Sequence, residues 1–200
     1  MTLELIGILS AVIFIIGDIP YLKNAIEASI KPQRITWGIA MALNAIGFAN
    51  QSASGADNSL WLFGAAVLMT GAIFIASLKN GVGGYSKLDI FAITTAIVGI
   101  ILWQVFDSPL ISILANLCVA VVALIPTFVK TKKDPTTETG IAWLFGSISA
   151  ALAGVSVGSL DVDLLILPIA STLLQAYMVY LIYVLPKRQS QNTVSAGEGS

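Results

Sequence analysis

The sequence predicts an all-α membrane protein with seven transmembrane helices, arranged as two parallel three-helix repeats joined by a linker helix. Three observations predict this fold class: the composition, the number of long apolar segments, and a similarity between the two halves of the chain. Hydrophobic residues make up 56% of the 200 residues and charged residues only 10%, whereas soluble domains carry roughly 25% charged residues. Such a chain has too little polar surface to face water on all sides, so we expect a lipid bilayer around it.

Seven apolar segments are each long enough to cross a bilayer, which takes roughly 20 apolar residues per helix. They cover residues 3–22, 35–53, 60–78, 88–106, 110–129, 141–160 and 164–185. The first segment is interpreted as a helix and not as a cleaved signal peptide, because it starts with Glu4 instead of basic residues and lacks a small-residue cleavage pattern.

Charges between the segments predict the orientation of the chain. The basic residues follow the first, third, fifth and seventh segments: Lys23, Lys31, Arg34, Lys79, Lys87, Lys130, Lys132, Lys133, Lys187 and Arg188. The opposite ends carry only acidic residues: Glu4, Asp57, Asp107, Asp161 and Asp163. The positive-inside rule then predicts a multi-pass protein of the cell membrane with its N-terminus outside and its C-terminus in the cytoplasm. The polar residues 187–200 are expected to form a disordered cytoplasmic tail.

An internal repeat relates the two halves. Pro20 and Pro126 are 106 positions apart, and so are Trp37 and Trp143. With only seven prolines and four tryptophans in the chain, a chance match of both residue types is improbable. The same shift pairs the first three segments with the last three, which predicts a first repeat at 3–80, a linker helix at 81–108 and a second repeat at 109–186. Parallel repeats of this kind are a transporter architecture with a binding site near the midplane.

With this layout the chain resembles the SWEET and PQ-loop superfamily, whose three-helix bundles carry a proline near the cytoplasmic end of the first helix. Pro20 and Pro126 stand at those places. The runs Tyr21-Leu-Lys-Asn, Lys31-Pro-Gln-Arg-Ile-Thr-Trp37 and Ala49-Asn-Gln51 are similar to those of uncharacterised bacterial SWEET-like or PnuC-like membrane proteins. The resemblance implies a transporter fold with three, one and three helices.

The sequence also departs from that family pattern. Tyr21 and Thr127 stand where the family has its glutamine, and Gly38 and Leu144 stand near the second-helix prolines of SWEETs. The third segment lacks the asparagine that lines the sugar pocket of SWEETs. These departures weaken an assignment to sugars.

Asp18 is an ionisable residue inside the first apolar segment, and such residues are costly in lipid and often functional. It is a candidate proton-coupling or substrate-binding carboxyl, and the alternative is an interface residue that pairs with Lys23. Pro20 and Pro126 each remove a backbone hydrogen bond within a helix, so they are candidate hinges for alternating access or static kinks.

Polar and aromatic residues at matching depths form the candidate substrate site. They are Asn44, Thr70, Asn116 and Gln175, together with Trp37 and Trp143. Each polar residue alone could serve as a hydrogen bond between helices, but as a set they fall where a central site is expected. The two tryptophans begin their segments near the cytoplasmic boundary, so the alternatives for them are headgroup anchors or gate packing.

Several function classes are excluded or disfavoured. The chain has no histidine and a single cysteine, Cys118, which leaves no basis for a zinc site, a Ser/His/Asp triad or a disulfide. We therefore expect no enzyme activity, no cofactor and no metal, and a formal net charge of -1 argues against nucleic acid.

The expected function is a carrier for a small polar solute, such as a sugar or other metabolite, acting as a facilitator or with proton coupling. The alternative is a heptahelical sensor, receptor or scaffold without transport. The sequence leaves open whether the protein is a monomer or a homo-oligomer.

Overall fold

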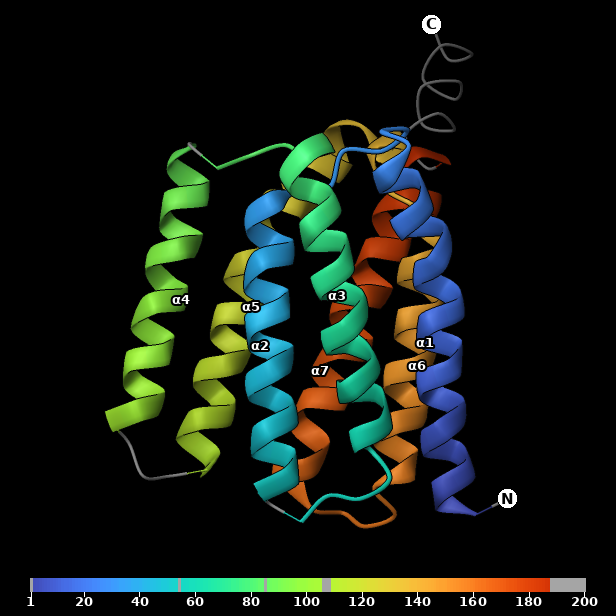
Figure 1. The fold of residues 1–200 in the computed structure, drawn as a ribbon, viewed down its shortest axis with the longest axis vertical. Coiled ribbons are helices and arrows are strands. Elements are labelled where there is room, and N and C mark those ends of the chain that lie inside the picture. Colours follow the sequence, from blue (N-terminus) through green and yellow to red (C-terminus); the bar gives the residue numbers. More distant parts are fainter. Residues whose placement is uncertain (1, 54, 85, 106–108, 188–200) are drawn as a thin grey trace, which may run out of the picture.

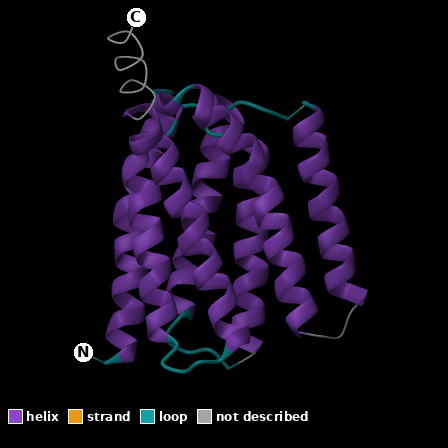
Figure 2. Ribbon diagram, turned by 180° about the vertical axis from the view of Figure 1, so that it is seen from behind, coloured by secondary structure: helices purple, strands orange, loops and turns teal. Residues whose placement is uncertain are grey.

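The computed structural model describes residues 2–53, 55–84, 86–105 and 109–187, and within them the fold is all-helical (Figure 1). The helices are α1 (Leu3–Ile26), α2 (Arg34–Ala53), α3 (Leu60–Asn80), α4 (Lys87–Val105), α5 (Pro109–Lys133), α6 (Gly140–Ser156) and α7 (Val162–Val179). A short 3₁₀ helix, η1 (Pro135–Thr137), precedes α6, and a π-helical turn, η2 (Tyr180–Val184), continues α7. Figure 2 shows no strand in this part of the chain, where Gln33 and Val82 form an isolated bridge.

Several helices are long and apolar enough for association with a membrane. Four stretches of the described residues are long and apolar enough to cross one: Leu3–Ile26, Leu60–Asn80, Ile113–Lys133 and Val162–Lys187. The helix α6 is also apolar but shorter, because it ends at Ser156 instead of the predicted residue 160. Gly158 adopts a φ of +70°, which turns the chain out of the helix.

The helices pack in a regular pattern around the bundle. Helix α1 packs against α3 and α6, while α5 packs against α7 and α2. Helix α2 also packs against α3, and α6 against α7. Helix α4 stands at the edge of the bundle, where it contacts mainly α5 (Figure 1). Six helices therefore surround the interior, and α4 lies outside it.

Small residues allow α1 and α6 to approach closely. A Cβ added to Gly17 would lie 2.3 Å from the Cβ of Phe145, so no larger residue fits at that crossing without a shift. Further along the same interface, the Ser149 hydroxyl donates a hydrogen bond to the backbone carbonyl of Ser10. Such contacts replace the hydrophobic effect as the cause of helix association in lipid.

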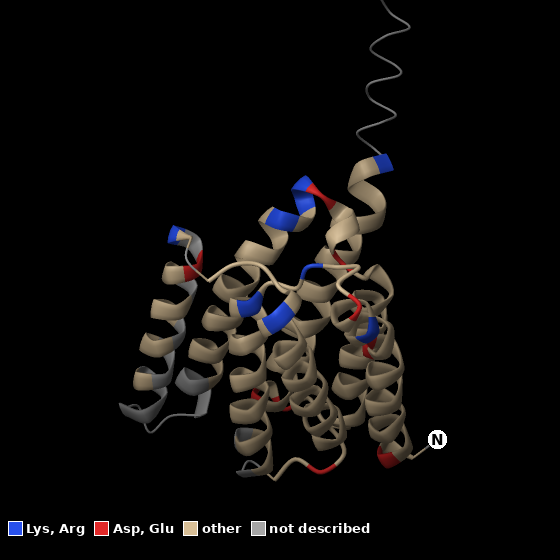
Figure 3. Ribbon diagram, turned by 45° about the horizontal axis from the view of Figure 1, so that its top comes forward, with Lys and Arg blue, Asp and Glu red and all other residues tan. Residues whose placement is uncertain are grey.

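Lys and Arg residues gather at one end of the bundle, whereas Asp and Glu residues occur at both ends (Figure 3). The basic end consists of the α1–α2, α3–α4 and α5–α6 connections and the end of α7, and it carries every described Lys and Arg. The acidic end consists of the start of α1 and the α2–α3 and α6–α7 connections, where Glu4, Asp57, Asp161 and Asp163 lie. Asp107, Arg188 and the rest of the predicted tail to residue 200 lie outside the described residues.

Candidate functional site

A cavity of about 180 Å³ lies inside the bundle, between α1, α2, α3, α5, α6 and α7. Near the acidic end it reaches Leu62 and Phe63 in the first turn of α3. Towards the basic end it reaches Trp37 and Trp143, in the first turns of α2 and α6. No described residue of α4 lines it. The cavity therefore extends over most of the length of the surrounding helices.

The candidate substrate residues line this one cavity. Asn44, Thr70, Asn116, Gln175, Trp37, Trp143 and Asp18 are all part of its wall. Six helices contribute them: α1, α2, α3, α5, α6 and α7. Pro20 and Pro126 lie inside α1 and α5 but not in the cavity wall.

The amide and hydroxyl groups in the wall are only partly engaged. Asn44 Nδ2 lies 3.5 Å from Thr70 Oγ1, a long contact, while the Thr70 hydroxyl donates to the carbonyl of Ala66 at 2.5 Å. The buried Nδ2 of Asn116 has no hydrogen-bond partner in the described part of the chain. Since buried donors normally find an acceptor, Asn116 has capacity to bind a solute.

Gln175 lies against the backbone of α6 because residue 146 is glycine. A Cβ at Gly146 would lie 1.7 Å from Gln175 Oε1, so even alanine would displace this side chain. The close approach places the amide of Gln175 in the cavity wall between α6 and α7.

Asp18 is the ionisable residue among the described residues of the cavity wall. Its relative exposure is 4%, and its Oδ2 atom has no hydrogen-bond partner among the described residues. Lys23, the partner considered from the sequence, is exposed and lies 3.9 Å from Glu27 instead. Lys23 is five residues from Asp18, so it points to a different face of α1. The carboxyl of Asp18 therefore lies in the cavity wall with no Lys or Arg of the described residues paired to it.

Three aromatic residues form what we call the aromatic cap: Tyr21, Trp37 and Trp143. The ring centroids of Tyr21 and Trp37 are 4.9 Å apart, and those of Trp37 and Trp143 are 6.0 Å apart. Trp37 Nε1 donates to the Tyr21 hydroxyl at 3.1 Å. All three side chains are buried. This buried position fits packing inside the bundle and not headgroup anchoring.

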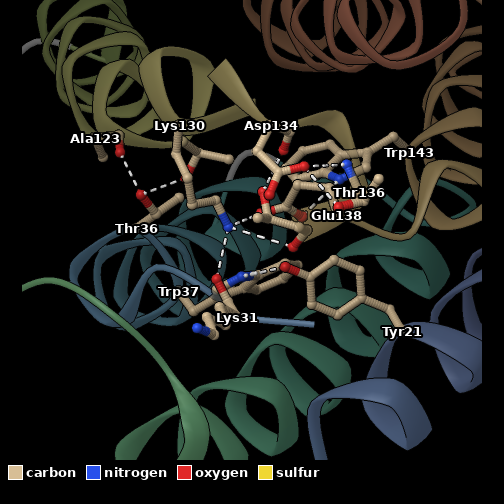
Figure 4. A network of polar contacts seen from close by, with 12 residues as sticks. Tyr21, Lys31, Thr36, Trp37, Ala123, Lys130, Asp134, Thr136, Glu138 and Trp143 are labelled. Carbon is tan, nitrogen blue, oxygen red and sulfur yellow. Dashed lines mark hydrogen bonds and ion pairs between the residues drawn. The ribbon is translucent and has the colours of Figure 1, made fainter. Parts of the chain in front are cut away.

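An ion pair lies beyond the cap, on its basic-end side (Figure 4). Trp143 Nε1 donates to Glu138 Oε2 at 3.1 Å, and Lys130 Nζ lies 2.5 Å from Glu138 Oε1. The Glu138 side chain is fully buried and that of Lys130 is 16% exposed. Lys130 also donates to the carbonyl of Lys31 at 2.6 Å. The pair connects α5 and the start of α6 to the α1–α2 connection.

The connection that carries Glu138 is shaped by Asp134. Its side chain accepts from the backbone N–H and the hydroxyl of Thr136, which caps η1. These hydrogen bonds from Thr136 hold the pKa of the Asp134 carboxyl below its ordinary value, because they favour the charged form. This N-cap of η1 fixes the direction of the connection, which brings Glu138 next to Lys130 on α5.

Two further contacts at the basic end join helices. The Thr127 hydroxyl on α5 donates to Thr36 Oγ1 on α2 at 2.9 Å, and Thr36 donates to the Ala123 carbonyl at 2.7 Å. The Arg34 guanidinium donates to the carbonyls of Ser77 and Gly81 at 2.9 and 2.7 Å. Arg34 thus has a structural role in fixing the end of α3 to α2.

Sequence reasoning missed Glu138, Lys130 as its partner, and the pair of threonines. For Glu138 a signal existed, because it is an acidic residue in a basic connection five residues before Trp143. For Thr36 and Thr127 no signal existed, since lone threonines are common in apolar helices.

Comparison with protein-family models, curated proteins and solved structures finds no match to this chain. Among the described residues, no three His, Cys, Asp or Glu side chains lie close enough together to hold a metal ion. The function is therefore argued from the cavity and its surroundings.

Proposed function

We propose that this chain is a membrane carrier for a small polar solute, moved by alternating access between two parallel three-helix repeats. The observation that carries the proposal is the cavity, because polar groups with spare hydrogen-bonding capacity meet there inside an otherwise apolar bundle. Apolar surroundings make such groups costly unless something binds to them.

The packing pattern supports the repeat. Under the shift of the sequence, the pair α1–α3 corresponds to α5–α7, the pair α2–α3 to α6–α7, and the pair α1–α6 to α5–α2, and all six pairs are in contact. The unpaired α4 lies at the edge of the bundle against α5, as a linker would. In this proposal all seven helices cross the bilayer, residues 3–80 and 109–186 form the repeats, and 81–108 joins them.

The basic end supplies the barrier that a carrier needs on one side of its site. The aromatic cap and the ion pair of Lys130 and Glu138 lie between the cavity and that end. By the positive-inside rule the basic end is cytoplasmic, and the N-terminus lies outside. Pro20 and Pro126 would be the hinges on which the cap opens, since each interrupts the backbone ladder of its helix near the cap.

The test is uptake into proteoliposomes of labelled sugars, amino acids and vitamin precursors. The cavity of the folded protein is then blocked by modifying a cysteine placed in its wall. Ala120 lines the cavity on α5, and Cys118 on the same helix is exposed at the bundle surface. We expect benzyl methanethiosulfonate to stop uptake by the variant Ala120→Cys in a Cys118→Ser background.

The matched control is the native chain, whose thiol at Cys118 faces away from the cavity and whose uptake should survive the reagent. If the folded protein takes up no compound of the panel, the carrier proposal fails and the heptahelical sensor becomes the better reading.

A further inference from the structure

We propose that the solute is a small organic cation, with its positive group held between the Asp18 carboxyl and the indoles of Trp37 and Trp143. This inference rests on the proposed function and names its substrate class. It is carried by the geometry of the cavity at its basic-end limit, where a buried acidic side chain and two tryptophans share one wall.

The buried Oδ2 of Asp18 has no partner among the described residues. Buried charges in proteins are paired, because an isolated charge in apolar surroundings is very costly. Asp18 is 4% exposed, its Oδ2 accepts no hydrogen bond from the described residues, and no Lys or Arg lines the cavity. A cationic solute would supply the missing charge. A bound proton would also neutralise this carboxyl, and the experiment below separates the two.

Aromatic side chains line the cavity together with Asp18. Asp18 and Tyr21 are three residues apart on α1, so they share a face with Cβ atoms roughly 5–6 Å apart. Asp18 therefore lies about one helical turn from the aromatic cap, on the side of the acidic end. Trp37 and Trp143 line the cavity there, with ring centroids 6.0 Å apart and planes at 44°. Indole faces attract ammonium groups, most strongly where water is excluded.

Acidic residues surround the acidic end of the bundle, and Asn116 adds a polar group to the cavity wall nearer that end. The described residues at that end include Glu4, Asp57, Asp161 and Asp163 and no basic residue, a distribution that attracts cations. Asn116 corresponds by the repeat to a position eight residues before Asp18, roughly 12 Å nearer the acidic end. In a longer cation such as tyramine, the hydroxyl at the far end of the solute would accept from the unpartnered Nδ2 of Asn116.

The experiment compares choline, tyramine and agmatine with a neutral isostere of choline, 3,3-dimethylbutan-1-ol. Binding to the purified full chain is measured by titration calorimetry, and uptake is measured separately in proteoliposomes. We expect at least one cation to bind, and choline to bind more tightly than its isostere if choline is that cation. Asp18→Asn should weaken cation binding by at least about 30-fold, the usual effect of truncating one partner of a buried charge pair.

Two further variants test the aromatic part and the fold. Trp37→Leu should weaken cation binding by about 3- to 30-fold, the range of a desolvated cation–π contact. The control Glu27→Gln removes an exposed carboxyl that pairs with Lys23 on the outside of the bundle and is not part of the cavity wall, so it should leave binding unchanged. Asp18→Asn should also raise the melting temperature in detergent, because it removes an unpaired buried carboxyl, so its loss of binding is not a loss of fold.

The outcomes separate this inference from the carrier function. Cation binding that depends on Asp18 without any uptake supports the site and overturns the carrier. Uptake of neutral solutes with no cation binding overturns the site and leaves the carrier, and if Asp18→Asn then removes the pH dependence of uptake, Asp18 is a proton site. Cation binding that survives Asp18→Asn also overturns the inference.

Discussion

Trp37 and Trp143 hold equivalent places in the two halves of the chain, yet different groups fix them. The indole N–H of Trp37 donates to a neutral phenol, Tyr21, within the first half. The indole N–H of Trp143 donates to a carboxylate, Glu138, which is itself paired with Lys130 in the second half. The two rings meet at a centroid distance of 6.0 Å, so the halves share a shape but differ in their polar contacts.

The two halves also differ in the residue that they place at the cavity, and here the carboxyl belongs to the first half. The first half places the carboxyl of Asp18 at the cavity, whereas Leu124 stands at the equivalent position of the second half. Charge thus lies at the cavity in one half and beyond the cap in the other. We infer that the first half contributes most to binding and the second half most to closing the basic end.

The contacts within each half differ in role from the contacts between halves. The bonds of Trp143 and Lys130 to Glu138 lie within the second half and can move with it. The bond from Lys130 to the Lys31 carbonyl and the contact of the two indoles join the halves. In the carrier that we propose, opening of the basic end would break the second group and could spare the first.

The largest effect is expected from Lys130→Met. This change leaves the fully buried Glu138 carboxylate without its cation, and breaking a buried pair from one side costs about 3–5 kcal/mol. The free energy of unfolding is measured by equilibrium unfolding in mixed detergent micelles. The control is Lys132→Met, an exposed lysine two residues away, which should change it little.

A double variant sharpens this prediction. Lys130→Met combined with Glu138→Gln should recover much of the lost stability, because the uncompensated charge is gone and the amide oxygen can still accept from Trp143. Full additivity of the two single changes would mean that the pair does not act as a unit.

An intermediate effect is expected from Tyr21→Phe in the first half. The buried indole N–H of Trp37 loses its acceptor, which costs about 1–3 kcal/mol while the ring packing is kept. Tyr177→Phe, at a tyrosine that is 47% exposed, is the control in the same unfolding assay. A loss equal to that of Lys130→Met would contradict the difference drawn between the halves.

The all-helical fold could be predicted because the length and apolar content of a segment are local properties. The cavity residues Asn44, Asn116 and Gln175 could also be placed, since counting along a helix gives the depth of a side chain in the bundle. The end of α6 was placed too late because the apolar count ran past Gly158, although a glycine followed by Ser159 and Asp161 is itself a signal for a helix end.

The contacts at the basic end could not be predicted from the sequence, because they depend on tertiary structure. Whether Glu138 is buried depends on how the α5–α6 connection folds over the helix ends, and that is a tertiary property. From the sequence Arg34 only indicates topology, because its bonds to the carbonyls of Ser77 in α3 and Gly81 just after it depend on how α2 packs against the end of α3.

The smallest effect is expected at the contact between α5 and α2. Thr127→Val removes one hydrogen bond to Thr36, whose hydroxyl keeps its bond to the Ala123 carbonyl, so the cost is about 0.5–1.5 kcal/mol. Thr131→Val is the control: it lies one turn further along α5, is equally buried, and its hydroxyl has no partner among the described residues, so its loss should be neutral or stabilising. Because Thr127 and Thr36 belong to different halves, Thr127→Val should also favour opening of the basic end, measured as faster labelling of a cysteine placed at Ala120 from that side. Equal labelling rates in the two variants would mean that this hydroxyl pair only packs the helices and does not hold the halves closed.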